Sequence, residues 1–498
     1  MPVTDETKYS PKVEAFLKEG PLPLYIGGRW ISSKDKKTFR TLDPGSGTTL
    51  TEVYDAHAED VDAAVQAARR AFKDSQWAKM DARKRGEYLH RLADLVEAHK
   101  ETLTEIEALD VGKPRLQAQG DIENFSSTLR YYIELSLHVS YRNPIPVSQH
   151  EARTVRHPYG VCGFIIPWNF PFLLAGWGIS PALVAGNTVV VKPAEDTPLS
   201  TLYLTKLIKE AGIPEGVVNV VPGLGESAGA ALARHPDLNR MSFTGSPEVG
   251  RLVAEACGRN LVPVKLELGG KGAAIVFDDV DIESTAEQLV GAVTLNTGQV
   301  CCTATRWVVQ ESIYDQFVKC AIDRMKKVNI GYWDDPSTQM GPAVSGKQMD
   351  RILGYLEKGK KEGAEVLLEG GRTEVSGRKD GFYVKPAMLA GAAENVAARE
   401  EIFGPVPFLL KFGSEEEALD VVNRSPYGLA DSVWSKDLSR ANRIAESLVT
   451  GNSWINAHNV FVHGVPYAGI NLSGLGGGVN SPQTFFDYLR EQSVVRPL

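Results

Sequence analysis

From residue 161 onward, short apolar runs alternate with segments of helical spacing, and this alternation limits the possible fold more than any other feature of the chain. The apolar runs read VCGFII, TVVVK, VVNVV, NRMSF and PVKLEL. Strands that are apolar along their whole length are buried on both faces, which is typical of a parallel sheet covered by helices on each side. The sequence therefore predicts an α/β fold with a doubly covered parallel sheet.

Local signals bound the predicted elements. The helix at 198–211 has Thr197 as its expected N-cap, Pro198 as its first helical residue and Gly212 as its C-terminal stop. A second βα series follows the first and predicts a second α/β domain. Its strands are expected at 273–277, 306–310, 382–389, 430–434 and 453–456, and its helices at 282–295, 312–328, 344–362, 414–424 and 437–447. In the first domain, helices are expected at 59–110, 172–184, 226–234 and 247–257.

Residues 139–157 have a different character. They are short, polar and β-like, and they include Pro144 and Pro146. This composition predicts a hairpin that protrudes from a domain. Residues 491–495 are expected to form a terminal strand.

Size and charge bound the function. With 498 residues the chain is too long for a single core, and a typical domain length gives about three domains. A net charge of −8 supplies no basic surface for nucleic acid, so a small-molecule partner is expected. Five cysteines are a sparse, odd set, and the adjacent pair at 301 and 302 is a poor disulfide candidate. A reducing, cytoplasmic location is therefore expected.

Neither a targeting segment nor a membrane span is expected. The first twenty residues mix acidic with basic side chains and lack an apolar core. Residues 158–191 carry no Asp, Glu, Lys or Arg. Prolines and asparagines nevertheless divide that stretch into pieces shorter than the roughly 20 apolar residues that a membrane helix needs. It is predicted to be buried core.

Three polar side chains at the ends of predicted elements are candidates for chemistry. Cys301 lies in GQVCCTATR, between a helix and a strand, where small neighbours leave room for a substrate to reach a thiolate. Glu267 ends the run VKLEL and is suited to act as a buried general base. Asn169, between two prolines, is suited to donate an amide hydrogen to an oxyanion. Taken singly, each has a plainer interpretation, as a small core cysteine or a surface side chain.

Two predicted turns are suited to a dinucleotide. KPAE (192–195) follows a strand and offers a lysine and an acid, and FTGSPEVG (243–250) joins a strand to a helix N-terminus. A pair of glycines at this spacing is weak evidence alone, because chance supplies such pairs in a glycine-rich chain.

In combination, six stretches resemble the aldehyde dehydrogenase superfamily, in the family's order and over essentially the whole chain. They are PWNFP (167–171), KPAE (192–195), FTGSPEVG (243–250), LELGGK (266–271), GQVCC (298–302) and EEIFGPV (400–406). The resemblance implies oxidation of an aldehyde to the acid through a thiohemiacetal and a thioester on Cys301. It makes Glu267 the base that activates the hydrolytic water, and Asn169 with the Cys301 amide the oxyanion hole.

The same resemblance implies NAD as the cofactor, with NADP accepted less well because Glu195 would repel a 2′-phosphate. Lys192 and Glu195 would hold the adenosine ribose, Ser246 the pyrophosphate, and Glu401 with Phe403 the nicotinamide ribose and ring. Further residues implied at the cofactor are Ile166, Pro167, Trp168, Gly225, Phe243, Gly245 and Leu268. No metal is implied.

An apolar substrate tunnel is also implied by the resemblance. It would be lined by Phe170, Leu174, Trp177, Leu295, Phe461 and Tyr467, with Asn459 and His463 near its mouth. Because no arginine is present to grip a carboxylate, a hydrophobic aldehyde, including an aromatic one, is favoured over a semialdehyde acid.

The family's plan implies two Rossmann-like parallel α/β domains and a small β arm. Residues 1–138 and 158–265 would form the dinucleotide-binding domain, 266–472 the catalytic domain, and 139–157 with 473–498 the oligomerisation arm. A homo-oligomer, either a dimer or a tetramer built as a dimer of dimers, is expected.

Two other functional classes stay open, a CoA-acylating relative and a catalytically silent structural member such as a lens crystallin. The first usually lacks the base found here as Glu267, and the second has no reason to keep Cys301, Glu267 and Asn169 together. One departure from the family also stands out. Many relatives carry a lysine and a glutamate where Gly178 and Gly478 stand here, and restoring the pair is expected to show favourable coupling unless a glycine is needed by the backbone.

Overall fold

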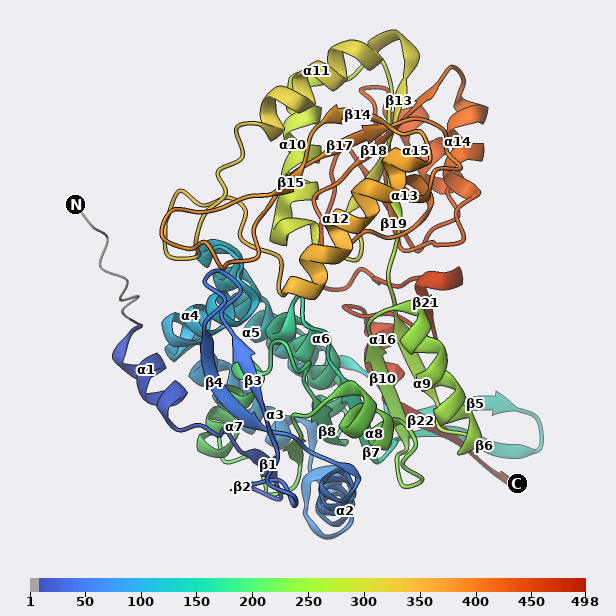
Figure 1. The fold of residues 1–498 in the computed structure, drawn as a ribbon. Coiled ribbons are helices and arrows are strands. Elements are labelled where there is room, and N and C mark those ends of the chain that lie inside the picture. The colour runs from blue at the N-terminus through green and yellow to red at the C-terminus, as the bar shows by residue number, and fades with distance from the viewer. Residues whose placement is uncertain (1–8) are drawn as a thin grey trace.

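Two large sheets form the body of the protein, one in each half of the ribbon in Figure 1. The computed structural model describes residues 9–498. The first eight of the twenty N-terminal residues, for which no targeting segment is expected, lie outside the described residues. The first sheet has eight strands in the order β2-β1-β9-β8-β7-β10-β11-β21. Its parallel centre is β9 (Val218–Val220), β8 (Thr188–Lys192), β7 (Val161–Ile165), β10 (Arg240–Thr244) and β11 (Val264–Glu267). Antiparallel strands β1 (Leu24–Ile26), β2 (Arg29–Ile31) and β21 (Gly474–Leu475) complete its edges.

Helices cover both faces of this sheet, as the apolar strands require. One face packs against α2 (Ala58–Asp74), α8 (Ala230–Ala233) and α9 (Pro247–Arg259). The other packs against α1 (Pro11–Lys18), α3 (Ala82–Ala98), α4 (Lys100–Val111), α5 (Arg115–His138), α6 (Pro171–Val184) and α7 (Leu199–Glu210). Every residue of β8 is buried, and each buried valine contributes roughly 1.5–3 kcal/mol of hydrophobic stabilisation. Short turns η1 (Trp77–Lys79) and η2 (Gly225–Gly229) and the ribbon of β3 (Thr38–Leu42) with β4 (Thr49–Tyr54) complete this half.

The second sheet has seven strands in the order β14-β17-β18-β13-β12-β19-β20. They are β12 (Gly272–Val276), β13 (Ala304–Gln310), β14 (Glu365–Leu368), β17 (Met388–Ala390), β18 (Phe408–Phe412), β19 (Ala430–Trp434) and β20 (Asn452–Ile455). One face is covered by α10 (Ile282–Thr294) and α11 (Tyr314–Met325). The other is covered by α12 (Gly346–Lys361), α13 (Val396–Arg399), α14 (Glu415–Asn423) and α15 (Leu438–Ser447). Minor elements are η3 (Leu295–Gly298), η4 (Glu311–Ile313), η5 (Asn471–Ser473) and the pair β15 (Gly371–Arg372) and β16 (Val384–Lys385).

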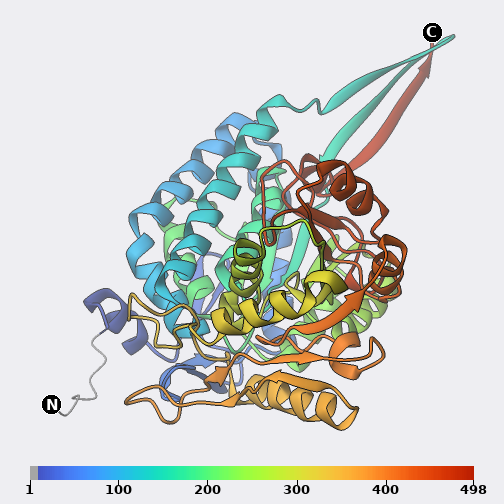
Figure 2. The ribbon, with the colours of Figure 1, turned by 90° about the horizontal axis from the view of Figure 1, so that it is seen from above.

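A three-stranded arm projects from the body, as Figure 2 shows. It consists of β5 (Arg142–Val147), β6 (His150–Pro158) and β22 (Leu489–Pro497), and the last of these follows the short helix α16 (Pro482–Phe486). All nine residues of β22 pair with β6, from Leu489 opposite Pro158 to Pro497 opposite His150. The hairpin at 139–157 and the terminal strand are therefore joined in one sheet.

The elements depart from the sequence expectations at several points. Helix α5, the N-terminal strands and β18 were not predicted. Polar residues hide the apolar periodicity of α5, whereas β18 is a short apolar run that is buried at four of its five residues. Helix α7 begins one residue later than expected, with Pro198 as N-cap, while Gly212 takes a positive φ of 75° as a stop should. Strand β11 crosses the predicted domain boundary at residue 265 and lies in the first sheet, as does β21 from the segment assigned to the arm. Within residues 9–498, no helix is long and apolar enough to cross a membrane.

We predict that the arm mediates self-association, because its outer strands β5 and β22 leave unpaired edges and exposed apolar side chains. Val495→Glu combined with Ile145→Glu should shift the protein to smaller assemblies, measured as molar mass by light scattering after gel filtration. Leu438→Glu is the matched control, because Leu438 and Val495 are both 59% exposed but Leu438 lies on α15. An unchanged mass in the arm variant would contradict the prediction.

Candidate active site

The backbone that carries Cys301 is held in an unusual conformation. After α10 ends at Thr294, Asn296 and Thr297 take positive φ values of 46° and 59°, a region that non-glycine residues occupy at a cost. The Asn296 side chain donates to the backbone oxygens of Asn169, at 2.9 Å, and of Gln299, at 3.4 Å. The Gln299 side chain in turn donates to the Asn296 carbonyl and accepts from the Val344 amide, each at 2.9 Å. These bonds hold the turn that presents Cys301.

The two adjacent thiols differ in their surroundings. Cys301 is partly exposed and its Sγ lies 3.4 Å from the Tyr467 hydroxyl, whereas Cys302 is buried with its Sγ 3.3 Å from Asn459 Oδ1. The hydrogen bond from the Cys302 thiol lowers the pKa of Cys301 to about 7, with help from Tyr467 and backbone amides and against the effect of burial. The pKa of Cys302 is raised well above its ordinary value by the same interaction and by burial. Thus Cys301 is the one of the pair poised to be a thiolate at neutral pH.

Asn169 joins the two halves of the site. Its Nδ2 donates to the Gln299 carbonyl at 3.0 Å, and its own carbonyl accepts from Lys113 Nζ at 3.0 Å. Lys113 is fully buried and paired with Asp121. Because a primary amide carries two hydrogens, one N–H of the buried Asn169 amide is left for a further acceptor beside the Cys301 segment.

Glu267 stands at the end of β11, and neither carboxylate oxygen has a partner in good hydrogen-bond geometry among the described residues, although the Gly469 backbone amide acts weakly to lower its pKa. Burial raises its pKa to about 8, while the nearby Lys265 charge acts in the opposite direction. It shares a narrow cavity of about 40 Å³ with Cys301. The other walls of this cavity include Leu174, Trp177 and Tyr467. A buried carboxyl and an acidic thiol therefore face one small space.

A separate hollow of about 700 Å³ lies over the first sheet, between α8 and α9, and is lined by Glu195, Gly225 and Phe243. The Glu195 carboxylate is bonded to Lys192 Nζ at 2.6 Å and to the Gly225 amide at 3.3 Å. Burial opposes ionisation of Glu195, but the Lys192 charge prevails and its pKa is lowered. Ser246 caps α9, where its hydroxyl accepts from the Val249 amide at 3.3 Å. The hollow thus has an acid in its wall and extends along α9 from Val249, three residues after the Ser246 cap, to Arg259.

Small residues let side chains approach the backbone around this region. A Cβ on Gly245 would lie 2.5 Å from the Phe243 ring, and one on Gly250 would lie 2.6 Å from Leu268. The segment 166–168 follows β7, and the Trp168 ring meets Phe403 edge-on, with ring centroids 5.2 Å apart. Ile166 is buried and Pro167 is half-buried.

Glu401 and Phe403 approach from the second half of the chain. Glu401 Oε1 accepts from the Gly270 amide at 2.9 Å, and burial raises the pKa of Glu401 to about 8. A Cβ at Gly269 would contact Glu401 Oε2, so a side chain at this position would displace the Glu401 carboxylate. Phe403 has a φ of 62°, and its carbonyl is held by Gln348 Nε2 at 2.7 Å.

The residues predicted to line a tunnel form an aromatic cluster beside Cys301. Trp177 meets Phe461 and Tyr467 with centroid distances of 5.4 and 5.8 Å, and those two rings lie 5.2 Å apart. Leu174, Phe170 and Leu295 pack on the same cluster. Phe170 also faces the buried Lys113, whose Nζ is 4.1 Å from the ring centroid. Asn459 contacts Cys302, and His463 stacks on Tyr131 and bonds Thr128 at 3.0 Å.

Sequence reasoning missed two buried lysines of this region, Lys113 beside Asn169 and Lys265 beside Glu267. Lys265 could have been found from its spacing, because residues two apart on a strand lie on the same face and Lys265 comes two residues before Glu267. The rescue of Gly178→Lys by Gly478→Glu stays a prediction, and the structure favours the alternative that the backbone needs glycine at 478, because a Cβ there would contact the Tyr467 carbonyl oxygen. At Gly178 a Cβ would meet the Phe164 ring at 3.0 Å, so a side chain there requires that buried ring to shift.

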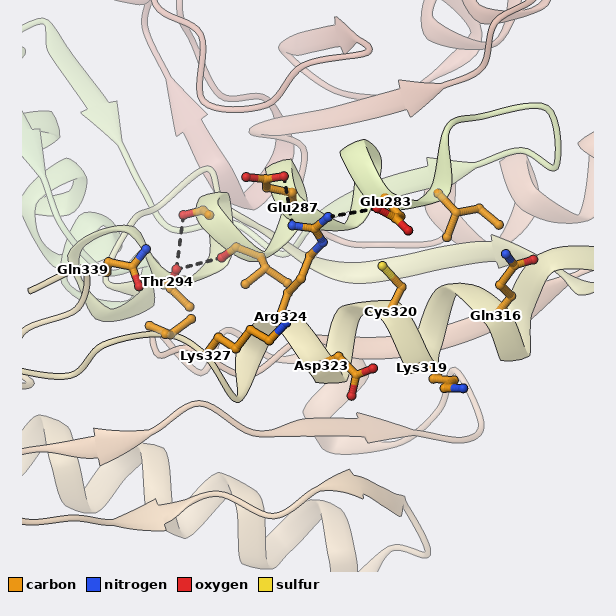
Figure 3. Close-up of a pocket in the computed structure, with 14 residues that line it drawn as sticks. Glu283, Glu287, Thr294, Gln316, Lys319, Cys320, Asp323, Arg324, Lys327 and Gln339 are labelled. Carbon is orange, nitrogen blue, oxygen red and sulfur yellow. Dashed lines mark hydrogen bonds and ion pairs between the residues drawn. The ribbon is translucent and has the colours of Figure 1, made fainter. Parts of the chain in front are cut away.

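A third hollow, of about 710 Å³, lies between α10 and α11 and contains Cys320 (Figure 3). Arg324 crosses it to pair with Glu283 and Glu287. None of the predicted site residues lines this hollow.

Comparison with known proteins identifies the family of the chain. The sequence profile of the aldehyde dehydrogenase family matches residues 30–494. Human mitochondrial aldehyde dehydrogenase is 43% identical over 91% of this chain and 88% of its own. Human retinaldehyde dehydrogenase 3 is 44% identical with the same coverage of both chains.

Solved structures show the same fold. An NAD+ complex of aldehyde dehydrogenase from Bacillus cereus has a TM-score of 0.95 at 39% identity, covering 99% of both chains. An NAD+ complex of betaine aldehyde dehydrogenase from Staphylococcus aureus also has a TM-score of 0.95, at 34% identity, covering 98% of this chain and 97% of its own. On sequence and structure together, the chain belongs to the aldehyde dehydrogenase family.

Proposed function

We propose that this NAD-dependent aldehyde dehydrogenase oxidises hydrophobic aldehydes, including aromatic ones, to carboxylic acids. One observation carries the proposal: the acidic thiol of Cys301 and the buried carboxyl of Glu267 line a single narrow cavity walled by Trp177, Leu174 and Tyr467. Oxidation of a hydrophobic aldehyde to the acid requires a nucleophilic thiol, a base and an apolar wall close together, and this cavity has all three.

Cys301 acts as the nucleophile. Its thiolate attacks the carbonyl carbon of the aldehyde, and a thiohemiacetal forms on Sγ as the carbonyl oxygen gains negative charge. The free Nδ2 hydrogen of Asn169 and the amide of Cys301 are the donors for that oxygen, because the bond to the Gln299 carbonyl fixes the Asn169 amide. Tyr467 and Cys302 stabilise the thiolate before attack.

The residues around the 700 Å³ hollow fit NAD. Glu195 offers a carboxylate to ribose hydroxyls, and Ser246 and the start of α9 offer amide hydrogens to phosphate. Gly225 has no side chain, so the cofactor can lie close to the backbone there. Glu401 and Phe403 would hold the nicotinamide end, with Ile166, Pro167, Trp168, Gly245 and Leu268 shaping the path between. When bound, NAD accepts the hydride that leaves the thiohemiacetal, and a thioester remains on Cys301.

Glu267 completes the reaction. It takes a proton from a water molecule as the water oxygen bonds to the thioester carbon, and the carbon–sulfur bond then breaks to release the acid and the Cys301 thiolate. The raised pKa of Glu267 suits this task, because a carboxylate with a pKa near 8 is a stronger base than an exposed one. A CoA-acylating enzyme has no use for this base.

The tunnel sets the substrate class. Its aromatic cluster is apolar, and the residues named for the tunnel, among them Phe170, Leu295 and Phe461, include no arginine that would pair with a second carboxylate. Asn459 and His463 supply the polar groups near the mouth.

The wider organisation of the molecule follows the family plan in this proposal. In this plan a domain assigned to 1–138 and 158–265, most of whose strands lie in the first sheet, binds the cofactor, and 266–472 supplies the catalytic residues. The arm, from 139–157 and 473–498, builds a homodimer or homotetramer. A cytoplasmic location is also proposed, and fractionation of cells that express the protein tests it.

A panel of aldehydes tests the substrate class and the cofactor together. We expect kcat/KM to be highest for aromatic and medium-chain aldehydes, lower for acidic semialdehydes, and higher with NAD than with NADP because Glu195 repels a 2′-phosphate. The measurement is the rate of reduced cofactor formation by absorbance. Preference for an acidic semialdehyde, or equal efficiency with both cofactors, would contradict this assignment.

Cys301→Ala should lower turnover by roughly three orders of magnitude or more, because the nucleophile is lost. Cys302→Ala should retain most activity but move the pKa of Cys301 upward from about 7, since the hydrogen bond from Cys302 is its main support. The rate of Cys301 alkylation by iodoacetamide, followed against pH, measures this pKa. Equal loss of turnover in the two variants would refute the assignment of the nucleophile.

Glu267→Gln should keep a stoichiometric burst of NADH and lose steady turnover, because the base acts after hydride transfer. In the unaltered enzyme, hydrolysis should speed up as pH rises through about 8, since only the deprotonated Glu267 accepts a proton from water. Stopped-flow absorbance separates the two phases. Absence of the burst in a variant that still binds NAD would assign Glu267 to an earlier step.

A further inference from the structure

A second charged side chain shares the cavity of Glu267. Lys265 lies two residues earlier on β11, so both side chains leave the same face of the strand. The register places Ser242 of β10 beside Lys265 and Thr244 beside Glu267, and all four residues line the same 40 Å³ cavity. Lys265 is 1% exposed and Glu267 is 7% exposed.

Neither group has a full set of partners within the described part of the chain. Lys265 Nζ donates to the Gly478 carbonyl at 3.3 Å, while neither oxygen of Glu267 has a partner in good hydrogen-bond geometry and the Gly469 backbone amide acts on it only weakly. A buried charge left alone is costly, whereas two opposite charges in one cavity stabilise each other. The pair therefore needs either direct contact or a bridging group.

The cavity has room for such a bridge. One water molecule needs roughly 10–15 Å³ of this kind of space together with two to four polar partners. The 40 Å³ available exceeds that volume, and hydroxyls of Ser242 and Thr244 stand beside the two charges. Gly178 of α6 forms part of the facing wall and contributes no side chain.

The other charged groups around Lys265 come from three elements. Burial lowers the pKa of Lys265 to about 8, Glu267 and Asp487 act to raise it, and Arg240 on β10 acts to lower it. Arg240 and Lys265 both lie near the Tyr488 ring, at 5.2 and 5.7 Å from its centroid. Cys301 acts on the other member, raising the pKa of Glu267.

We propose that Lys265 is a positioning residue for the general base: through a water molecule in the shared cavity, its ammonium group stabilises the carboxylate form of Glu267 that thioester hydrolysis requires. The proposal rests on the proposed role of Glu267. It assigns to β11 both the base and the cation that keeps the base ionised.

Hydrolysis of p-nitrophenyl acetate tests the proposal without the cofactor. The ester acylates Cys301 and releases a burst of p-nitrophenolate, and the steady rate that follows reports hydrolysis of the acyl-enzyme. Lys265→Met should keep the burst amplitude, lower the steady rate at neutral pH about tenfold, and move the pH midpoint of hydrolysis upward by about one unit. Lys265→Gln keeps a hydrogen bond to Gly478 without the charge, so it should behave like Lys265→Met.

Two further variants separate charge from structure. Gly178→Lys in the Lys265→Met background returns a cation to the same cavity and should recover part of the hydrolysis rate and of the pH midpoint. Lys271→Met is the matched control, because Lys271 is also 1% exposed but does not line the Glu267 cavity. It should leave the pH midpoint of hydrolysis unchanged, with thermal unfolding measured for each variant.

An unshifted pH midpoint in both Lys265→Met and Lys265→Gln would overturn the proposal. A parallel fall of burst and steady rate, together with a lower Tm, would also overturn it by showing a structural role alone. Failure of the proposed function looks different: hydrolysis in the otherwise unaltered enzyme would then be insensitive to Glu267→Gln.

Discussion

The hydrogen bonds between Asn169 and the segment 296–299 are the constraint on which the site depends. Asn169 follows β7 of the first sheet, and Gln299 precedes β13 of the second. The bonds from Asn169 Nδ2 to the Gln299 carbonyl and from Asn296 Nδ2 to the Asn169 carbonyl cross between the two halves. They hold two residues in a positive-φ turn that would otherwise relax, and that turn sets the position of the thiol.

Burial supplies the chemistry once this junction is fixed. The same exclusion of water that raises the pKa of Glu267 also makes each remaining polar contact stronger, so the hydrogen bonds from Cys302, from Tyr467 and from backbone amides together lower the pKa of Cys301. A carboxyl and a thiol with pKa values near neutrality then stand in one cavity, which suits the proposed roles of Glu267 and Cys301. The cost is a carboxylate without a partner in good hydrogen-bond geometry among the described residues, and the nearby Lys265 offsets part of it.

Glycines make the close approaches possible, and their reasons differ. The absence of a side chain at Gly269 lets the Glu401 carboxylate reach the Gly270 amide. Gly298 packs directly against the Gly404–Pro405 backbone, and a Cβ there would clash with the carbonyl carbon of Gly404. Gly478 has no room for a side chain because the Tyr467 carbonyl is too close. Gly178 instead keeps part of a cavity wall open. The backbone clash therefore explains why glycine stands at 478 in place of the glutamate of many relatives. No backbone clash explains why glycine stands at 178 in place of their lysine.

The sequence by itself determined the parallel strands, the helices between them and the family, because apolar runs, caps and ordered motifs are local signals that survive without tertiary contacts. It also marked Cys301, Glu267 and Asn169 as candidates from their places at element ends. Only the tertiary structure decided that β11 and β21 join one sheet and that Lys265 faces the cavity of Glu267. The acidity of Cys301, rather than of its neighbour, was likewise decided there. Strand pairing, burial and pKa depend on residues far apart in the chain, and no local pattern records which of them will meet.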